Sequence, residues 1–204
     1  RKRRADYKKE AVVEEEVNVK YDLKYVEAKT DNQHKAFKSF YDDKNLLLHG
    51  VAGTGKTFLA LYLALESVIR GDAPKPIVIL RSVVPSRDMG FLPGKIEEKG
   101  AAFELPYHGI CAELTGHATA YEHMKKSGLI QFSTTSHLRG LTFRGNTIII
   151  DECQNMTFSE LDTIMTRVGK GCRVIFCGDF RQTDFWRDEE KSGLHKFMDV
   201  LKTM

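Results

Sequence analysis

The sequence contains no apolar run long enough for a helix to cross a membrane, so a helical membrane span is excluded. The basic residues 1–4 have no apolar stretch after them, and a secretory signal is therefore not indicated. The cysteines Cys111, Cys153, Cys172 and Cys177 are irregularly spaced and form no CxxC pair. This favours reduced thiols over zinc ligands or disulfides. We therefore expect a cytoplasmic protein with no membrane partner.

The sequence also lacks a large excess of one sign of charge. The formal net charge is only +3, which is too small to indicate a nucleic-acid partner by itself. Hydrophobic residues make up 42% and charged residues 29% of the 204 residues, which is typical of a globular domain. Internal repeats are lacking. We expect an N-terminal extension over residues 1–28 and one domain over residues 29–204.

Hydrophobic periodicity predicts the order of strands and helices. Val17 to Tyr25 alternates apolar and polar side chains, which predicts a strand or hairpin arm in the extension. Thr30 can cap a helix that begins near Asp31. Short apolar runs predict strands at 45–49, 77–80, 129–133, 147–150 and 173–177, and helices at 57–70, 95–126, 158–168 and 189–201. Strands alternating with helices indicate the α/β class, with a mostly parallel sheet flanked by helices.

The most specific motif is a glycine loop between the first of these strands and a helix. Residues 50–57 match GxxxxGK[ST] without deviation. Glycines let successive backbone N–H groups point at a phosphate, and the following helix directs the positive end of its dipole to the same anion. Lys56 would reach the β- and γ-phosphates, and the Thr57 hydroxyl would bind Mg²⁺. The expected nucleotide-binding residues here are Gly50, Val51, Ala52, Gly53, Thr54, Gly55, Lys56, Thr57 and Phe58.

Two carboxylates follow the strand at 147–150. Asp151 is expected to hold the Mg²⁺, directly or through water, and Glu152 is the candidate general base for the attacking water. A strand that ends in Asp-Glu is weak evidence alone, but it is strong evidence downstream of a phosphate loop. The next strand ends in a similar way, where Asp179 or Gln182 could contact the γ-phosphate; a plain strand-end turn is the alternative.

Several motifs follow one another along the chain, in the order HGVAGTGKT, MGFLPGK, RGLTFRGNTIIIDECQN, MTRVG, CGDFRQTD and KSGL. In this order they resemble the motifs of PhoH-like proteins, and the resemblance covers about residues 29–195. Such proteins occur in bacteria and in many bacteriophages, and their name refers to phosphate starvation. The family is similar to the first RecA-type lobe of superfamily-one helicases. The resemblance therefore implies a RecA-like P-loop NTPase that uses ATP and Mg²⁺, in the host cytoplasm if a phage encodes it.

The resemblance also implies roles outside the phosphate loop. Gln33 lies where helicases place an adenine-reading glutamine. Arg81, Arg87 and Lys95 lie at or near the loop that helicases bring to a nucleic-acid backbone. This sequence departs from the family pattern at Cys153, where alanine is usual, and at Arg81-Ser82, where an arginine-proline pair is usual. The second departure puts the nucleic-acid loop in doubt.

Only one RecA-like lobe fits into this chain, whereas helicases complete their ATP site with arginines from a second lobe. We therefore expect a ring-like homo-oligomer, for which a hexamer is one arrangement, with an arginine acting in trans. Arg167 is the first candidate and Arg139 the second; a surface arginine is the alternative reading of each.

Three functions compete at this point. The first is an ATPase coupled to single-stranded RNA or DNA, and the second is an ATP-dependent binding or scaffold module with little turnover. The third is a small-molecule kinase. Glu152 directly after Asp151 argues against pure binding and against a kinase, because neither needs this base.

Overall fold

The computed structural model describes residues 21–70, 75–82, 96–138 and 141–179, together with Phe197 and Asp199. The elements of this part are α1 (Asp31–Tyr41), β1 (Leu46–His49), α2 (Lys56–Arg70), β2 (Ile77–Arg81), α3 (Ile96–Thr115), α4 (Ala120–Lys126), β3 (Ile130–Thr134), the 3₁₀ turn η1 (Thr135–His137), β4 (Thr147–Asp151), the 3₁₀ turn η2 (Cys153–Asn155), α5 (Phe158–Met165) and β5 (Arg173–Gly178). Most of the helix predicted at 189–201 and of the loop predicted at 82–94 lies outside the described residues.

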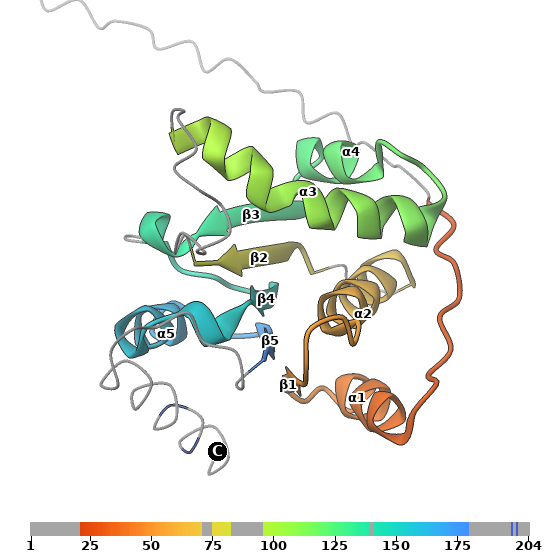
Figure 1. Cartoon of the computed structure of the whole chain (residues 1–204), viewed down its shortest axis with the longest axis horizontal. Coiled ribbons are helices and arrows are strands. Elements are labelled where there is room, and N and C mark those ends of the chain that lie inside the picture. The colour runs from red at the N-terminus through yellow and green to blue at the C-terminus, as the bar shows by residue number, and fades with distance from the viewer. Residues whose placement is uncertain are drawn as a thin grey trace, which may run out of the picture.

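The five strands form one sheet in the order β1-β5-β4-β2-β3, and every pair is parallel (Figure 1). All carboxyl ends therefore lie along one edge, where ligands of open α/β sheets bind. Strand β5 separates β1, which precedes the glycine loop, from β4, which ends in the acidic pair. The predicted α/β class, with its parallel sheet flanked by helices, is confirmed.

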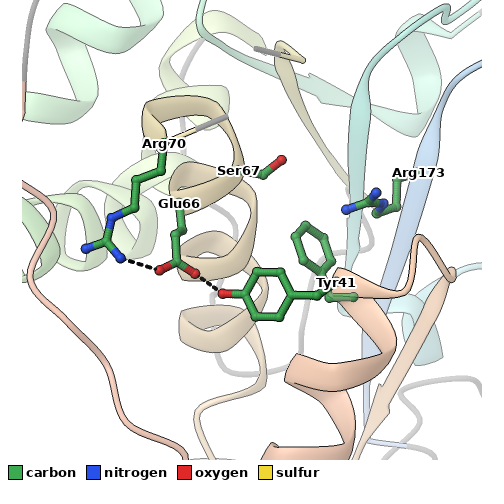
Figure 2. A pocket seen from close by; sticks show the side chains of 6 residues that line it. Tyr41, Glu66, Ser67, Arg70 and Arg173 are labelled. Atoms are coloured by element: carbon green, nitrogen blue, oxygen red, sulfur yellow. Dashed lines mark hydrogen bonds and ion pairs between the residues drawn. The ribbon is translucent and has the colours of Figure 1, made fainter. Parts of the chain in front are cut away.

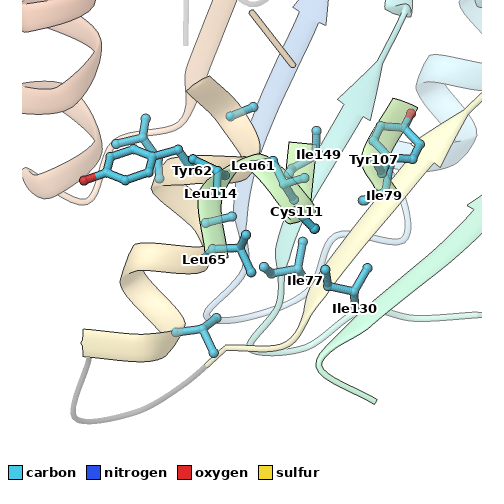
Figure 3. Close-up of a cluster of buried hydrophobic side chains, with 14 of the residues drawn as sticks. Leu61, Tyr62, Leu65, Ile77, Ile79, Tyr107, Cys111, Leu114, Ile130 and Ile149 are labelled. Atoms are coloured by element: carbon cyan, nitrogen blue, oxygen red, sulfur yellow. The ribbon is translucent and has the colours of Figure 1, made fainter. Parts of the chain in front are cut away.

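Apolar side chains from both faces of the sheet form two cores. Ile77 and Ile79 contribute to the core under α1 to α4, while Val78 and Leu80 contribute to the core under α5. Figure 3 shows the first core, in which side chains of α2 and α3 pack onto the strands. In Figure 1, α5 lies on the opposite side of the sheet from α2. Burial on both faces explains why the inner strands β2, β4 and β5 are nearly continuous apolar runs, whereas the edge strand β3 alternates apolar and polar residues.

The predicted N-terminal strand is wrong over residues 21–25, which are extended but form no strand, and its first part lies outside the described residues. Tyr21 and Leu23 are buried, whereas Tyr25 is 75% exposed. The Lys24 N–H donates to the Leu114 carbonyl (2.8 Å) in the last turn of α3. The last carbonyls of a helix lack intrahelical partners, so this segment satisfies a helix end and does not extend the sheet.

Within the described residues, no helix combines the length and apolar character that crossing a membrane requires. All four cysteines are free thiols, and only Cys172 among them is partly exposed.

Candidate functional site

The glycine loop joins β1 to α2 at the carboxyl edge of the sheet. Gly53 and Gly55 have φ angles of 76° and 77°, in the left-handed region that favours glycine. The Gly50 N–H donates to the Gly178 carbonyl (3.3 Å), which ties the loop to the end of β5. The loop is exposed from Val51 to Gly55, so it can accept a ligand from solvent.

Lys56 lies over this loop. Its Nζ donates to the carbonyl oxygens of Gly50 and Val51, both at 2.9 Å, and the Thr54 hydroxyl donates to the Val51 carbonyl (2.8 Å). The ammonium group is therefore the positive charge at the mouth of the loop. Phe58, predicted to contact nucleotide, is partly buried and packs against the core under α2.

Asp151 lies at the end of β4 and is only 3% exposed. Its Oδ1 accepts from the Thr57 hydroxyl (2.8 Å), and its Oδ2 accepts from the Tyr107 hydroxyl (2.9 Å). Burial raises the pKa of the Asp151 carboxyl, while the two hydrogen bonds oppose that shift. The structure thus brings the predicted metal residues Thr57 and Asp151 together. Hydroxyl and carboxylate oxygens are hard ligands, so this pair fits Mg²⁺.

Tyr107 was not predicted from the sequence, although it contacts the predicted metal residue. Burial, and then the charge of Asp151, raise the pKa of the Tyr107 hydroxyl well above its usual value. It therefore stays protonated at neutral pH and serves as a donor.

Glu152 follows Asp151 in the left-handed conformation, with φ 52° and ψ 40°. A non-glycine residue in this region is uncommon and costs conformational energy. Its Oε2 accepts a hydrogen bond from the Gln154 Nε2. The Gln154 Oε1 in turn accepts from the Asp179 N–H (3.1 Å) at the end of β5. Gln154 therefore joins the candidate base to the next strand of the sheet. It was not predicted as a site residue, although it lies within the motif IIIDECQN.

Gly178 shows how tightly β5 approaches this turn. A Cβ atom placed on Gly178 would lie 2.7 Å from the Cys153 Sγ and 3.0 Å from the Gln154 Oε1. No side chain fits there, so the glycine allows Gln154 to reach β5. The small side chain of Cys153 likewise lets the end of β5 pack closely against this turn.

Arg81 lies at the end of β2, in register with Asp151 on the neighbouring strand. Its guanidinium lies over the Phe103 ring, with 5.6 Å between the Cζ atom and the ring centroid. The structure therefore places Arg81 beside the candidate metal site as well as at the predicted nucleic-acid edge. Arg87 and Lys95, the other two predicted contacts, lie outside the described residues.

Gln33 lies in the first turn of α1, where its backbone N–H donates to the capping Thr30 hydroxyl (3.2 Å). Its side-chain oxygen accepts from the Lys29 N–H (2.6 Å). The amide is therefore held at the start of the helix, and its role in reading adenine stays a prediction.

Arg167 lies at the opposite edge of the sheet. The Phe143 N–H donates to the Arg167 carbonyl (2.9 Å), and Phe143 and Val168 form a parallel bridge ahead of β4 and β5. The length of β4, which has five residues, therefore separates Arg167 from Asp151, by roughly 16 Å. Its guanidinium does not belong to the site of its own chain. Gln182 and Arg139 lie outside the described residues.

A hollow of about 350 Å³ lies at the far end of α2 from the glycine loop (Figure 2). Glu66 on its wall is buried, pairs with Arg70 (2.7 Å) and accepts from the Tyr41 hydroxyl. Arg173 on the other wall pairs with Asp43. Each of these charged side chains has a partner within the protein, and the hydrogen bond from Tyr41 to Glu66 holds α1 against α2. The cluster therefore has a structural explanation and does not indicate a ligand.

Comparison with known sequences gives a consistent result. The profile of a family described as "PhoH-like protein" matches residues 25–204. A PhoH-like protein of Synechocystis sp. is 33% identical over 177 residues, which cover 87% of this chain and 53% of the relative. A PhoH-like protein of Bacillus subtilis is 31% identical over 193 residues, which cover 95% and 60%. Protein PhoH of Escherichia coli is 30% identical over 161 residues, which cover 78% and 46%. The chain spans about half the length of these curated relatives.

Solved structures that show some similarity to this chain include the Pif1 helicase from Candida albicans, with a TM-score of 0.37 and 20% identity over 77% of this chain and 34% of that chain. Another is the Sulfolobus solfataricus SWI2/SNF2 ATPase core in complex with dsDNA, with a TM-score of 0.46 and 13% identity over 88% of this chain and 37% of that chain. TM-scores this low support no inference about this chain.

Proposed function

Because this chain belongs to the PhoH-like protein family, we propose that it binds ATP together with Mg²⁺ and hydrolyses the nucleotide. The observation that carries the proposal is the hydrogen bond of 2.8 Å between Thr57 and Asp151, beside the loop that ends in Lys56. A hydroxyl and a carboxylate distant in sequence meet at the mouth of a glycine loop, and this pair suits a nucleotide-bound Mg²⁺.

Each residue of the site has a defined task under this proposal. The backbone N–H groups of residues 50–57 and the first turn of α2 bind the phosphates. Lys56 exchanges its loop carbonyls for phosphate oxygens, to which it donates charge-assisted hydrogen bonds. Thr57 and Asp151 hold Mg²⁺, which when bound neutralises phosphate charge.

Glu152 orients the attacking water and accepts its proton on a carboxylate oxygen. The Gln154 amide keeps that carboxylate turned toward the end of β5. Asp179, one of the two residues predicted to contact the γ-phosphate, lies at this end. The Gln154 side chain therefore joins the proposed base to the end of β5.

A single-stranded RNA or DNA is the proposed polymer that stimulates turnover. Its support is the motif order in the sequence and the position of Arg81 at the strand ends, beside Asp151. A phosphate contact at Arg81 would lie close enough to the metal site to affect it.

Turnover measured alone and with single-stranded RNA, single-stranded DNA or heparin tests this coupling. We expect one nucleic acid to raise ATP turnover, and added salt to weaken the effect because phosphate contacts release counterions. Heparin controls for bulk negative charge. Equal stimulation by heparin, or no response to any polymer, would remove the coupling. Binding of ATP without turnover in every condition would favour an ATP-dependent scaffold module.

We also propose that the chain forms a homo-oligomer in which Arg167 reaches the γ-phosphate held by a neighbour. Arg167 lies at the amino edge of the sheet, so it can serve only a site on another copy. Its guanidinium makes an exposed hydrogen bond of 3.5 Å, from Nη1 to the Leu141 carbonyl, which Arg167 would exchange for phosphate oxygens of the neighbour.

Arg167→Ala is expected to reduce turnover strongly, up to a factor of roughly 10³ to 10⁵ for an arginine acting in trans. Turnover per chain of the unaltered protein should rise with protein concentration. Arg144→Ala is the matched control, because Arg144 is exposed on the strand segment beside Arg167. Concentration-independent turnover that survives Arg167→Ala would refute the role in trans.

A further inference from the structure

Asp151 receives one hydroxyl on each carboxylate oxygen, and the two donors come from different parts of the fold. Thr57 at the start of α2 donates to Oδ1 (2.8 Å), and Tyr107 in α3 donates to Oδ2 (2.9 Å). Thr57 belongs to the proposed metal site, whereas Tyr107 belongs to a helix with no assigned part in nucleotide chemistry. The second donor therefore needs an explanation.

The Tyr107 ring is held rigidly. It is 0% exposed, stacks on Tyr121 with 6.4 Å between ring centroids, and packs against Phe132 at 5.9 Å. Figure 3 shows its hydroxyl pointing away from Ile77 and Ile130, out of the apolar cluster. A hydroxyl on a fixed aromatic ring has few rotamers available, so it presents its proton at one point in space.

The same face of α3 also contacts the end of β2. Phe103, one helical turn before Tyr107, lies under the Arg81 guanidinium, and Arg81 is in register with Asp151. The position of α3 therefore sets both the donor to the carboxylate and the surroundings of Arg81.

We propose that Tyr107 is a positioning residue of the magnesium site, whose hydroxyl fixes the rotation of the Asp151 carboxylate so that Oδ1 faces Thr57 and the metal. The inference rests on the proposed binding of ATP and Mg²⁺. Groups that hydrogen-bond a metal ligand commonly change metal affinity by about 10- to 100-fold when they are removed. A freed Oδ2 would leave the carboxylate able to turn away from Thr57.

Tyr107→Phe removes the hydroxyl and keeps the ring. Binding of a labelled ATP is titrated with Mg²⁺, and again in excess EDTA. We expect the Mg²⁺ concentration for half-maximal binding to rise about tenfold or more, with the EDTA affinity unchanged. A purely structural role would instead lower the melting temperature and alter both affinities together.

Tyr121→Phe is the matched control. Tyr121 is equally buried, stacks on Tyr107, and donates its hydroxyl to Glu104 (2.6 Å) in α3, away from Asp151. It should leave the Mg²⁺ requirement unchanged. An identical Mg²⁺ requirement in the unaltered protein and both variants would overturn the role of Tyr107 while leaving the proposed function in place. If the unaltered protein bound no ATP at any Mg²⁺ concentration, the proposed function itself would fail, and the inference with it.

A second measurement applies if Tyr107→Phe does not fold. In a chain otherwise unaltered, 3-fluorotyrosine is placed at position 107 or at position 121, and ¹⁹F resonances are recorded with ATP before and after Mg²⁺ is added. We expect the resonance from position 107 to shift and that from position 121 to stay. Shifts that are equal or absent would overturn the proposal.

Discussion

Lys56→Ala is expected to weaken binding of labelled ATP by about 10- to 150-fold and to remove measurable turnover. A hydrogen bond from a charged donor contributes about 1.5–3 kcal/mol, which corresponds to that range of affinity. In the described structure the ammonium is already placed at the loop mouth by two carbonyls, so it needs little rearrangement to reach phosphate oxygens. Equilibrium binding with Mg²⁺ present, followed by phosphate release, measures both effects.

Lys125→Ala provides the control for this loss of one positive charge. Lys125 in α4 pairs with Glu104 (2.7 Å), away from the phosphate loop, and should leave ATP affinity unchanged. The proposed site would be refuted if Lys56→Ala and Lys125→Ala both bound ATP as the unaltered protein does.

The fold was largely predictable because its strands are short apolar runs separated by helices. Burial on both faces makes the inner strands of this sheet nearly continuous apolar runs, and Ile148 to Ile150 is the plainest case. The N-terminal segment was not predictable, because alternation reports only that one side is buried. Tyr21 and Leu23 are buried as expected, but against helices, and the Lys24 N–H bonds to the end of α3 instead of a strand. Local pattern does not identify the hydrogen-bond partner.

The site was predictable where its residues are contiguous. The glycine loop with Lys56 and Thr57 is one stretch of sequence, and its chemistry can be recognised from residue types and spacing alone. Gln154 also carried a signal, because it lies in the motif that includes Asp151 and Glu152, but its link to Asp179 depends on how closely β5 approaches.

Tyr107 carried no signal in the sequence. It lies in a helix with weak amphipathic pattern, and an aromatic residue there indicates core packing in the absence of other information. Only the packing of α3 onto the sheet brings its hydroxyl to Asp151. The location of Arg167 was not predictable either. The bridge between Phe143 and Val168 determines which edge of the sheet this residue occupies.

Glu152→Gln is expected to reduce turnover by about 10²- to 10⁴-fold, the range that general-base catalysis contributes, while ATP binding stays within about twofold. The new amide has the size of the carboxylate and keeps a carbonyl oxygen that can accept from Gln154. A glutamine at this position also has to adopt the left-handed backbone conformation, with φ 52°, so the conformational cost is unchanged. It cannot take a proton from water, so only the chemical step should be lost. Phosphate release and equilibrium ATP binding, measured on the same preparation, separate the two.

Asp162→Asn is the control for removal of one acidic charge, because Asp162 is exposed on α5 and lies outside the cluster around Asp151. It should change neither quantity. Full turnover in Glu152→Gln would exclude this residue as the base. Loss of binding together with turnover would mean that the Glu152 charge supports the metal site, since Glu152 already acts electrostatically on the neighbouring Asp151. The difference between kcat and ATP affinity therefore decides whether the carboxylate removes a proton or only contributes charge.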